Sequence, residues 1–129
     1  MKKSKKLLSI VLAILMIVAA IPVVSLPALA AEGYNGTPLY PELITEDNYD
    51  TFGLKDKKFA GYLAIRNASE FYGFAEYIKE TRDYTANVVL LNDIVVNENM
   101  NNPEYQWEPI EFYCGNFDGN GCTISGIWV

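Results

Sequence analysis

The stretch that decides the fold is Phe117-Asp118-Gly119-Asn120-Gly121-Cys122-Thr123-Ile124-Ser125-Gly126-Ile127-Trp128-Val129. It holds two turn dipeptides in succession, Asp118-Gly119 and Asn120-Gly121, and their glycines can take the positive φ that a sharp change of direction needs. Aromatic and β-branched residues, which favour strands, lie on both sides. The stretch therefore predicts a corner between two strands, built from Phe117, Asp118, Gly119, Asn120 and Gly121. Two strands alone are marginal in water, so we expect further strands in the chain.

The first 30 residues have the layout of a secretory signal peptide. Four lysines lie among the first six residues, an apolar run extends from Leu7 to Leu26, and Ala28-Leu29-Ala30 offers a small-x-small cleavage site. An uncleaved anchor is the alternative, because the apolar run is long enough to cross a bilayer core of about 30 Å. Two prolines and the alanine site favour cleavage after Ala30. We therefore expect a secreted or cell-surface protein that meets the membrane only through its signal peptide.

Charge and composition exclude several classes of function. Cleavage after residue 30 of the 129 leaves 99 residues, which is enough for one small domain. All 16 acidic residues but only six of the ten lysines and arginines lie in that mature chain, so its net charge is −10. Such a surface repels phosphate backbones and anionic lipid, which excludes nucleic acid as a partner. Cations and cell-wall or host glycans stay open as partners.

The chain has no histidine and only two cysteines. The absence of histidine excludes Ser-His-Asp and Cys-His nucleophiles and imidazole metal ligands, and two cysteines cannot complete a four-ligand zinc site. Cys114 and Cys122 flank the corner and would meet an oxidising exterior, so they are candidates for a disulfide. In a tight hairpin their sulfur atoms would be out of register, and the alternative is two small, partly buried apolar residues. We expect no cofactor.

Residues 31–60 predict an extended lead-in, and residues 61–129 predict a domain. Within the lead-in, apolar residues that could anchor it are Leu39, Leu43, Ile44, Phe52 and Leu54. Residues 61–65 predict a strand. Asn67 followed by Glu70 has the arrangement of a capping box, and the spacing of Phe71, Phe74, Ala75 and Ile78 predicts an amphipathic helix over about 68–80.

A second strand is predicted over 87–96, with a break at Asn92-Asp93. Its β-branched, apolar composition predicts burial on both faces or a neighbour on each side. A polar loop follows over 97–103, and another strand is predicted from Trp107 through Phe112 to the corner. No glycine-rich phosphate loop joins the first strand to the helix, so the order of elements does not indicate a nucleotide-binding unit.

Together, these segments resemble the opening module of bacterial cell-surface proteins with the GLUG motif. The resemblance covers residues 61–129 and is most specific from Phe117 to Gly126. It is incomplete in two ways: Cys122 stands where a polar residue is common, and residues 61–129 contain none of the family's repeats. It implies a mainly β fold with one capping helix, the start of an incomplete right-handed parallel β-helix; a small α+β domain is the alternative. It also implies that the open edge is covered by downstream solenoid coils or by self-association.

Three functions follow as hypotheses. The first is a non-catalytic extracellular module, the cap and first coil of a β-helical surface protein, with adhesion or glycan binding as its role. The alternative is a fragment of a β-helical lyase or glycosidase. The carboxylates that could serve as its catalytic acid and base are Asp93, Glu108, Glu111 and Asp118. The third is a calcium site at Asp118 and Asn120, which competes with plain turn formation. Tyr34, Tyr40 and Tyr49 could stack on sugars or pack under the lead-in.

Overall fold

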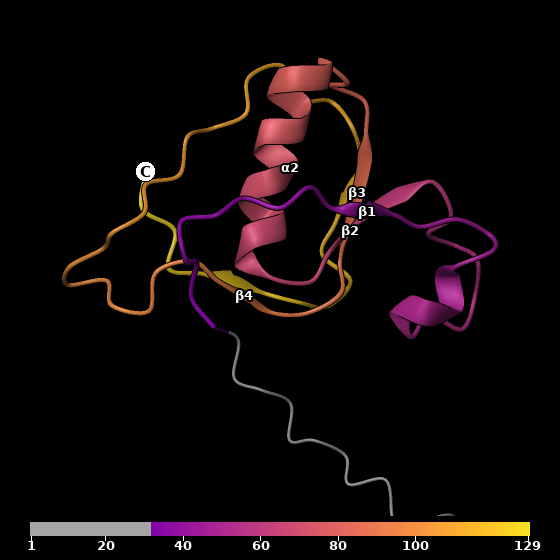
Figure 1. Ribbon diagram of the computed structural model, residues 1–129, viewed down its shortest axis with the longest axis horizontal. Helices are drawn as coiled ribbons and strands as arrows, with labels where there is room; N and C mark the ends of the chain where they lie inside the picture. The colour runs from indigo at the N-terminus through magenta and orange to yellow at the C-terminus, as the bar shows by residue number, and fades with distance from the viewer. Residues whose placement is uncertain (1–31) are drawn as a thin grey trace, which may run out of the picture.

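The computed structural model describes residues 32–129, so the predicted signal peptide, residues 1–30, and its cleavage site lie outside the described residues. The described chain is a mixed α and β fold with one α-helix and two small sheets, which agrees with a small α+β domain (Figure 1). Within residues 32–129, no helix has both the length and the apolar character that crossing a membrane requires.

Six short strands form the two sheets. The first sheet has the order β1 (Glu42–Leu43), β2 (Tyr62–Ile65), β3 (Asn87–Leu90), β5 (Phe117–Asp118), with β1 antiparallel and the others parallel. The second sheet pairs β4 (Ile94–Val95) in parallel with β6 (Ile124–Ser125). The strand predicted over 61–65, the strand over 87–96 with its break, and a strand after the corner are thereby confirmed. Of the strand predicted before the corner, only its end, β5, is formed.

The helix α2 (Ala68–Thr81) confirms the predicted helix and its start. The side-chain oxygen of Asn67 accepts a hydrogen bond from the Glu70 backbone N–H at 2.9 Å, as an N-cap does. The Glu70 carboxylate, which is buried, accepts from the backbone N–H of Arg66 at 2.7 Å and pairs with the Arg66 guanidinium. The glutamate of this capping box therefore reaches the residue before the cap instead of the cap itself.

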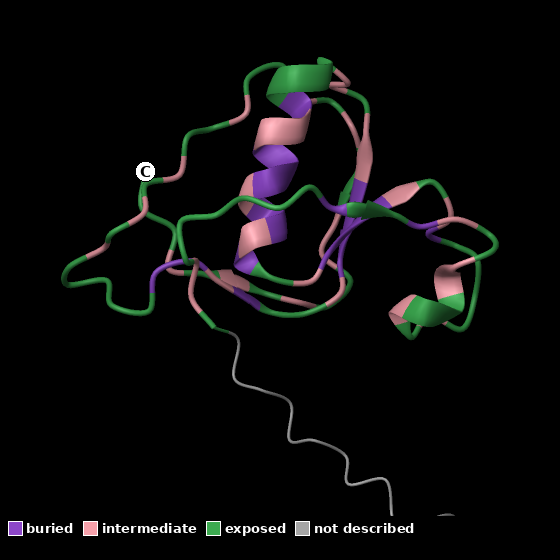
Figure 2. Ribbon diagram, viewed as in Figure 1, coloured by how far each residue is buried: buried purple, intermediate pink, exposed green. Residues whose placement is uncertain are grey.

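The core lies between α2 and the two sheets, with a second apolar cluster behind the first sheet (Figure 2). Alternate residues of the 87–96 segment face different clusters: Val88 and Leu90 pack with the helix, and Val89 packs on the other side with Ile44 and Phe59. The first sheet is thus buried on both faces, as its composition predicts. The predicted helix stripe is also buried and consists of Phe71, Phe74, Ala75 and Ile78.

The lead-in is only partly anchored in the predicted way. Ile44 is fully buried, and Phe52, at the end of the 3-10 helix η1 (Tyr49–Phe52), packs against the second cluster together with Leu54. Leu39 and Leu43 are 53% and 49% exposed, so the expectation that they anchor the lead-in is wrong. Their backbones make the contacts instead: Leu43 lies in β1, and the Leu39 N–H donates to the Ser69 carbonyl at 2.9 Å.

The predicted strand from Trp107 to Phe112 is wrong. This segment is irregular, and near it only Gln106 forms a β-bridge, to Trp128. Pro109 has no N–H to donate, and Phe112 has a φ of +62°, which is incompatible with a strand. The aromatic residues that suggested a strand are used differently, since Trp107 stacks on Phe71 of the helix with ring centroids 4.2 Å apart.

Candidate functional site

The predicted corner carries the chain from the first sheet into the second. Asn120 and Gly121 have φ values of +47° and +73°, and the Cys122 N–H donates to the Gly119 carbonyl at 2.8 Å, which is the pattern of a type I′ turn. The prediction of a positive φ is therefore correct for Gly121 and wrong for Gly119. The second residue of the turn with a positive φ is Asn120. Asparagine tolerates this conformation, and the Asp118 carboxylate accepts from the Asn120 N–H at 2.8 Å.

This corner is tied to the break at Asn92-Asp93 in the preceding strand. The Asn120 side-chain amide donates to the Leu90 carbonyl at 3.2 Å, just before the break. The Asp93 carboxylate accepts from the Thr123 N–H at 2.9 Å, just after the corner. The two bends therefore lie against each other and are joined by side chains, a link that neither stretch indicates by itself.

Backbone hydrogen bonds extend the same pairing through both bends. In the first sheet, the Val88 N–H donates to the Asn116 carbonyl at 2.9 Å. In the second, the Ile94 N–H donates to the Thr123 carbonyl at 2.8 Å, and the Val96 N–H donates to the Ser125 carbonyl at 2.9 Å. The Trp107 N–H likewise donates to the Trp128 carbonyl at 2.7 Å. Paired residues are 29 positions apart between β3 and β5 and 30 apart between β4 and β6. Two successive stretches thus run parallel through a bend, and the bend of the second stretch contains one extra residue.

The two ends of the sheets differ. At one end, antiparallel β1 covers β2, and α2 packs against both β2 and β4. At the other end, β5 and β6 each have a strand partner on one side only among the described residues. We call the outward-facing side of β5 and β6 the open edge. Phe117 and Trp128, each 41% exposed, lie along this stretch of chain.

Both cysteines near the corner are free in the structure, so the candidate disulfide between Cys114 and Cys122 is not formed. The sulfur of Cys114 is 3.5 Å from the Tyr84 carbonyl, and that of Cys122 is 3.8 Å from the Leu90 carbonyl. Burial, with a contribution from the Asp93 charge, raises the pKa of the Cys122 thiol. Cys122 is half-buried, as the alternative expected, whereas Cys114 is exposed.

The structure gives the predicted calcium residues another role. Among residues 32–129 no three acidic, cysteine or histidine side chains are grouped as metal ligands would be. One Asp118 oxygen holds the turn, and the Asn120 amide holds Leu90. Calcium binding at Asp118 and Asn120 therefore stays an untested expectation, while the competing role in turn formation is confirmed.

The four carboxylates that are candidates for sugar cleavage lie in different local environments. Asp93 accepts from the Thr123 N–H, whereas Glu108 forms an ion pair with Lys79 of the helix at 3.1 Å. Glu111 is exposed in the irregular segment, and Asp118, at the end of β5, holds the following turn by accepting from the Asn120 N–H. Each of these carboxylates thus has a local role or is exposed to solvent.

Asn97 organises this region, and sequence reasoning missed it. Its side chain is buried, donates to the carbonyls of Tyr105 and Gly126 at 2.7 and 2.9 Å, and accepts from the N–H groups of Glu104 and Tyr105, both at 2.9 Å. It thereby closes the loop between residues 97 and 105 and joins it to the following stretch. The asparagine-rich loop gives no signal that singles out this residue.

The described fold is thus a small α+β unit in which two stretches of chain are stacked in parallel. No family model matches the chain, and no curated protein or solved structure matches it significantly. The resemblance to GLUG-motif surface proteins therefore stays a prediction from the sequence.

Proposed function

We propose that this chain is the N-terminal cap and the first turns of a right-handed parallel β-solenoid, a non-catalytic module of a secreted or cell-surface protein. One observation carries the proposal: the stretch from β3 through β4 pairs in parallel with the stretch from β5 through β6, and the two bends lie against each other with one extra residue in the second. Repeat architectures are built by such stacking of successive chain segments. The parallel β-bridge between Gln106 and Trp128 is a third place where the continuations of these two stretches pair.

The covered end has the features of a cap. An exposed edge of parallel strands invites uncontrolled pairing, and proteins block such edges with short, charged or differently directed elements. Here a two-residue antiparallel strand with an exposed glutamate, Glu42, covers β2, and the helix covers β4. In the proposed module, α2 closes the core at the level of β2.

The open edge is the functional surface of the proposed module. In a parallel strand, backbone groups of alternate residues point to alternate neighbours, so Phe117 and Ile124 direct their N–H and C=O groups away from β3 and β4. The occupant we propose is a further coil of the same solenoid, with self-association of two copies as the competing outcome. Adhesion to cell-wall or host glycans would then be a property of the assembled surface.

The test is an intact-mass and hydrogen-exchange measurement on the native product, captured from source cells with an antibody against residues 61–129. We expect a species much larger than the 99-residue mature chain, with slow exchange at Phe117 and Ile124. A 99-residue species in a dimer with the same protection would replace the further coil by a second copy. A monomeric 99-residue species with fast exchange at both residues would refute the proposal, because its open edge would have no occupant.

A further inference from the structure

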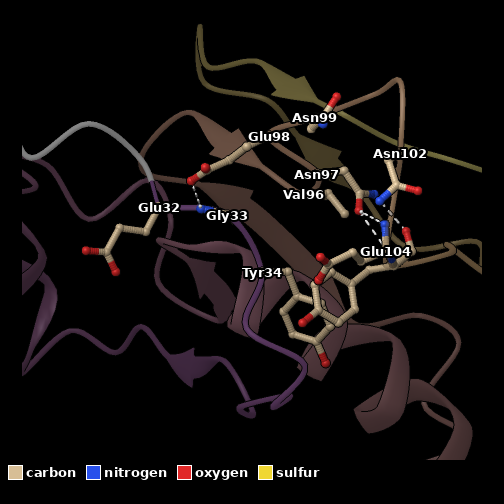
Figure 3. A pocket seen from close by; sticks show the side chains of 10 residues that line it. Glu32, Gly33, Tyr34, Val96, Asn97, Glu98, Asn99, Asn102 and Glu104 are labelled. Atoms are coloured by element: carbon tan, nitrogen blue, oxygen red, sulfur yellow. Dashed lines mark hydrogen bonds between the residues drawn. The ribbon is translucent and has the colours of Figure 1, made fainter.

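A second site lies away from the open edge, where residues 32–34 pass the loop that starts at Val96. A pocket of about 540 Å³ is found there, within the range of small-molecule sites (Figure 3). Its lining includes the rings of Tyr34 and Tyr105 and the carboxylates of Glu98 and Glu104. No residue of β5 or β6 lines it, so it is distinct from the open edge.

The walls of this pocket are held in place by contacts that do not need a ligand. The Tyr34 N–H donates to the Val96 carbonyl at 3.0 Å, and the Gly33 N–H donates to one Glu98 oxygen at 3.1 Å. The Tyr34 ring is stacked on Tyr72 of the helix, with centroids 3.9 Å apart and planes 3° from parallel. The Asn97 side-chain oxygen accepts a hydrogen bond from the Glu104 N–H and so holds the two ends of the loop together. The pocket is therefore preformed, which lowers the entropic cost of binding.

The charge of the lining selects the ligand. Three carboxylates belong to it, those of Glu32, Glu98 and Glu104, and no lysine or arginine does. In Figure 3, Glu98 and Glu104 lie on two sides of the hollow, with Tyr34 at its base. Carboxylates at neutral pH attract a protonated amine and repel anionic sugars, and tyrosine rings attract cations and apolar C–H faces.

The polar lining adds a second requirement. Side-chain amides such as that of Asn102 both donate and accept, which suits hydroxyl groups. We propose that the pocket binds an amino sugar, with its ammonium group between Glu98 and Glu104, its hydroxyls toward the amides and its ring against Tyr34. A neutral sugar would leave the carboxylates without a charged partner, and an N-acetylated one would lose the positive charge.

The test is titration of the 15N-labelled full chain with glucosamine, followed by NMR. We expect shifts at the Gly33 backbone amide and the Asn102 side-chain amide. N-acetylglucosamine, glucose and a lysine amide should each bind at least about tenfold more weakly, since a charge-assisted hydrogen bond contributes about 1.5–3 kcal/mol and the sugar hydroxyls add to it. Equal binding of the lysine amide would overturn the saccharide part of the proposal, and equal binding of glucose would overturn the role of the amine.

A charge-matched pair of variants separates the pocket from the general acidity of the chain. In Glu98→Gln/Glu104→Gln, the glutamine oxygen can still accept from Gly33, so the fold should hold while glucosamine binding falls about tenfold or more. The control is Glu46→Gln/Glu111→Gln, which removes two exposed charges outside the pocket. Should both variants bind glucosamine alike, or should the native chain show no shift at Gly33 and Asn102, the proposal is wrong. Thermal melting confirms that each variant is folded, and the single variant Glu104→Gln replaces the double variant if that unfolds.

Discussion

Replacing Asn97 by alanine tests the link between the two stacked stretches. The Asn97 side chain is 6% exposed and makes four hydrogen bonds, all to backbone groups: two join it to Tyr105, one to Glu104 and one to Gly126. The first three close the loop, and the fourth reaches across to the next stretch of chain. Alanine removes all four bonds. The N–H groups of Glu104 and Tyr105 lose their acceptor, whereas the Gly126 carbonyl keeps the Asn97 backbone N–H at 3.2 Å and the Tyr105 carbonyl keeps the Tyr72 hydroxyl at 3.4 Å.

The expected loss follows from this count. A typical hydrogen bond contributes about 0.5–1.5 kcal/mol net, so four contribute about 2–6 kcal/mol. Glu104 is exposed and Tyr105 and Gly126 are half-buried, so water can satisfy part of what is lost, and the lower half of that range applies. We expect the free energy of unfolding to fall by about 3 kcal/mol, which corresponds to a fall in Tm of about 12–24 °C for a domain of this size.

The assay is urea unfolding together with amide hydrogen exchange. The control is Asn102→Ala, which makes the same chemical change at an exposed position of the same loop and should cost no more than about 0.5 kcal/mol. In Asn97→Ala, the amides of Glu104 and Tyr105 should also lose protection. If the two variants lose the same stability, or if Asn97→Ala costs less than about 1 kcal/mol, the reasoning that Asn97 joins the stretches is wrong.

Three further predictions concern the backbone and one half-buried phenol. Gly73→Ala should lower stability by about 1–2 kcal/mol in urea unfolding, because a Cβ there would overlap the Leu39 carbonyl and outweigh the helix propensity of alanine; a more stable variant would contradict this. Gly121→Val should lower Tm more than Gly119→Val does, because only Gly121 has a positive φ; equal effects would show that the turn differs from the one described. Burial, assisted by the charges of neighbouring groups, raises the pKa of Tyr113 from 10.0 to about 12, so its contribution to stability should be complete below pH 10 and be lost as pH rises toward 12. Tyr113→Phe should flatten that decline, and ultraviolet titration should find one phenol fewer near pH 12; an unchanged titration curve would assign the shift elsewhere.

The elements that sequence predicts correctly are those fixed by neighbours in the chain. The start of α2 depends on Asn67 and Glu70, three residues apart, and its buried face depends on a regular spacing within a dozen residues. The break at Asn92-Asp93 and the turn at Asn120-Gly121 are likewise local choices of backbone conformation. Such signals operate before any tertiary contact forms, so they can be recognised in the sequence alone.

The features that sequence misses depend on contacts between distant residues. The sequence predicts that the Leu43 side chain anchors the lead-in, yet Leu43 is exposed and joins a strand by pairing with Leu63. Trp107 has strand propensity, but stacking on Phe71 decides its place. At the candidate site, the corner itself is predictable, whereas its bond to Asp93 joins residues 30 positions apart and has no local signal.

The same distant contacts bear on whether the stacking can repeat. In the pairing of β4 with β6, Thr123 is the residue stacked on Asp93. The Asp93 carboxylate accepts a hydrogen bond from the Thr123 backbone N–H. Thr123 also carries a side-chain oxygen that can accept an N–H from a further level. Thr123 is exposed and therefore offers, one position beyond Asp93 in the stacking direction, a side-chain acceptor for an N–H, although a hydroxyl binds an N–H less strongly than a carboxylate does. A coil added at the open edge would thus meet an acceptor at this position as well as the free backbone groups of β5 and β6, whereas α2 and β1 give it no comparable edge at the opposite end.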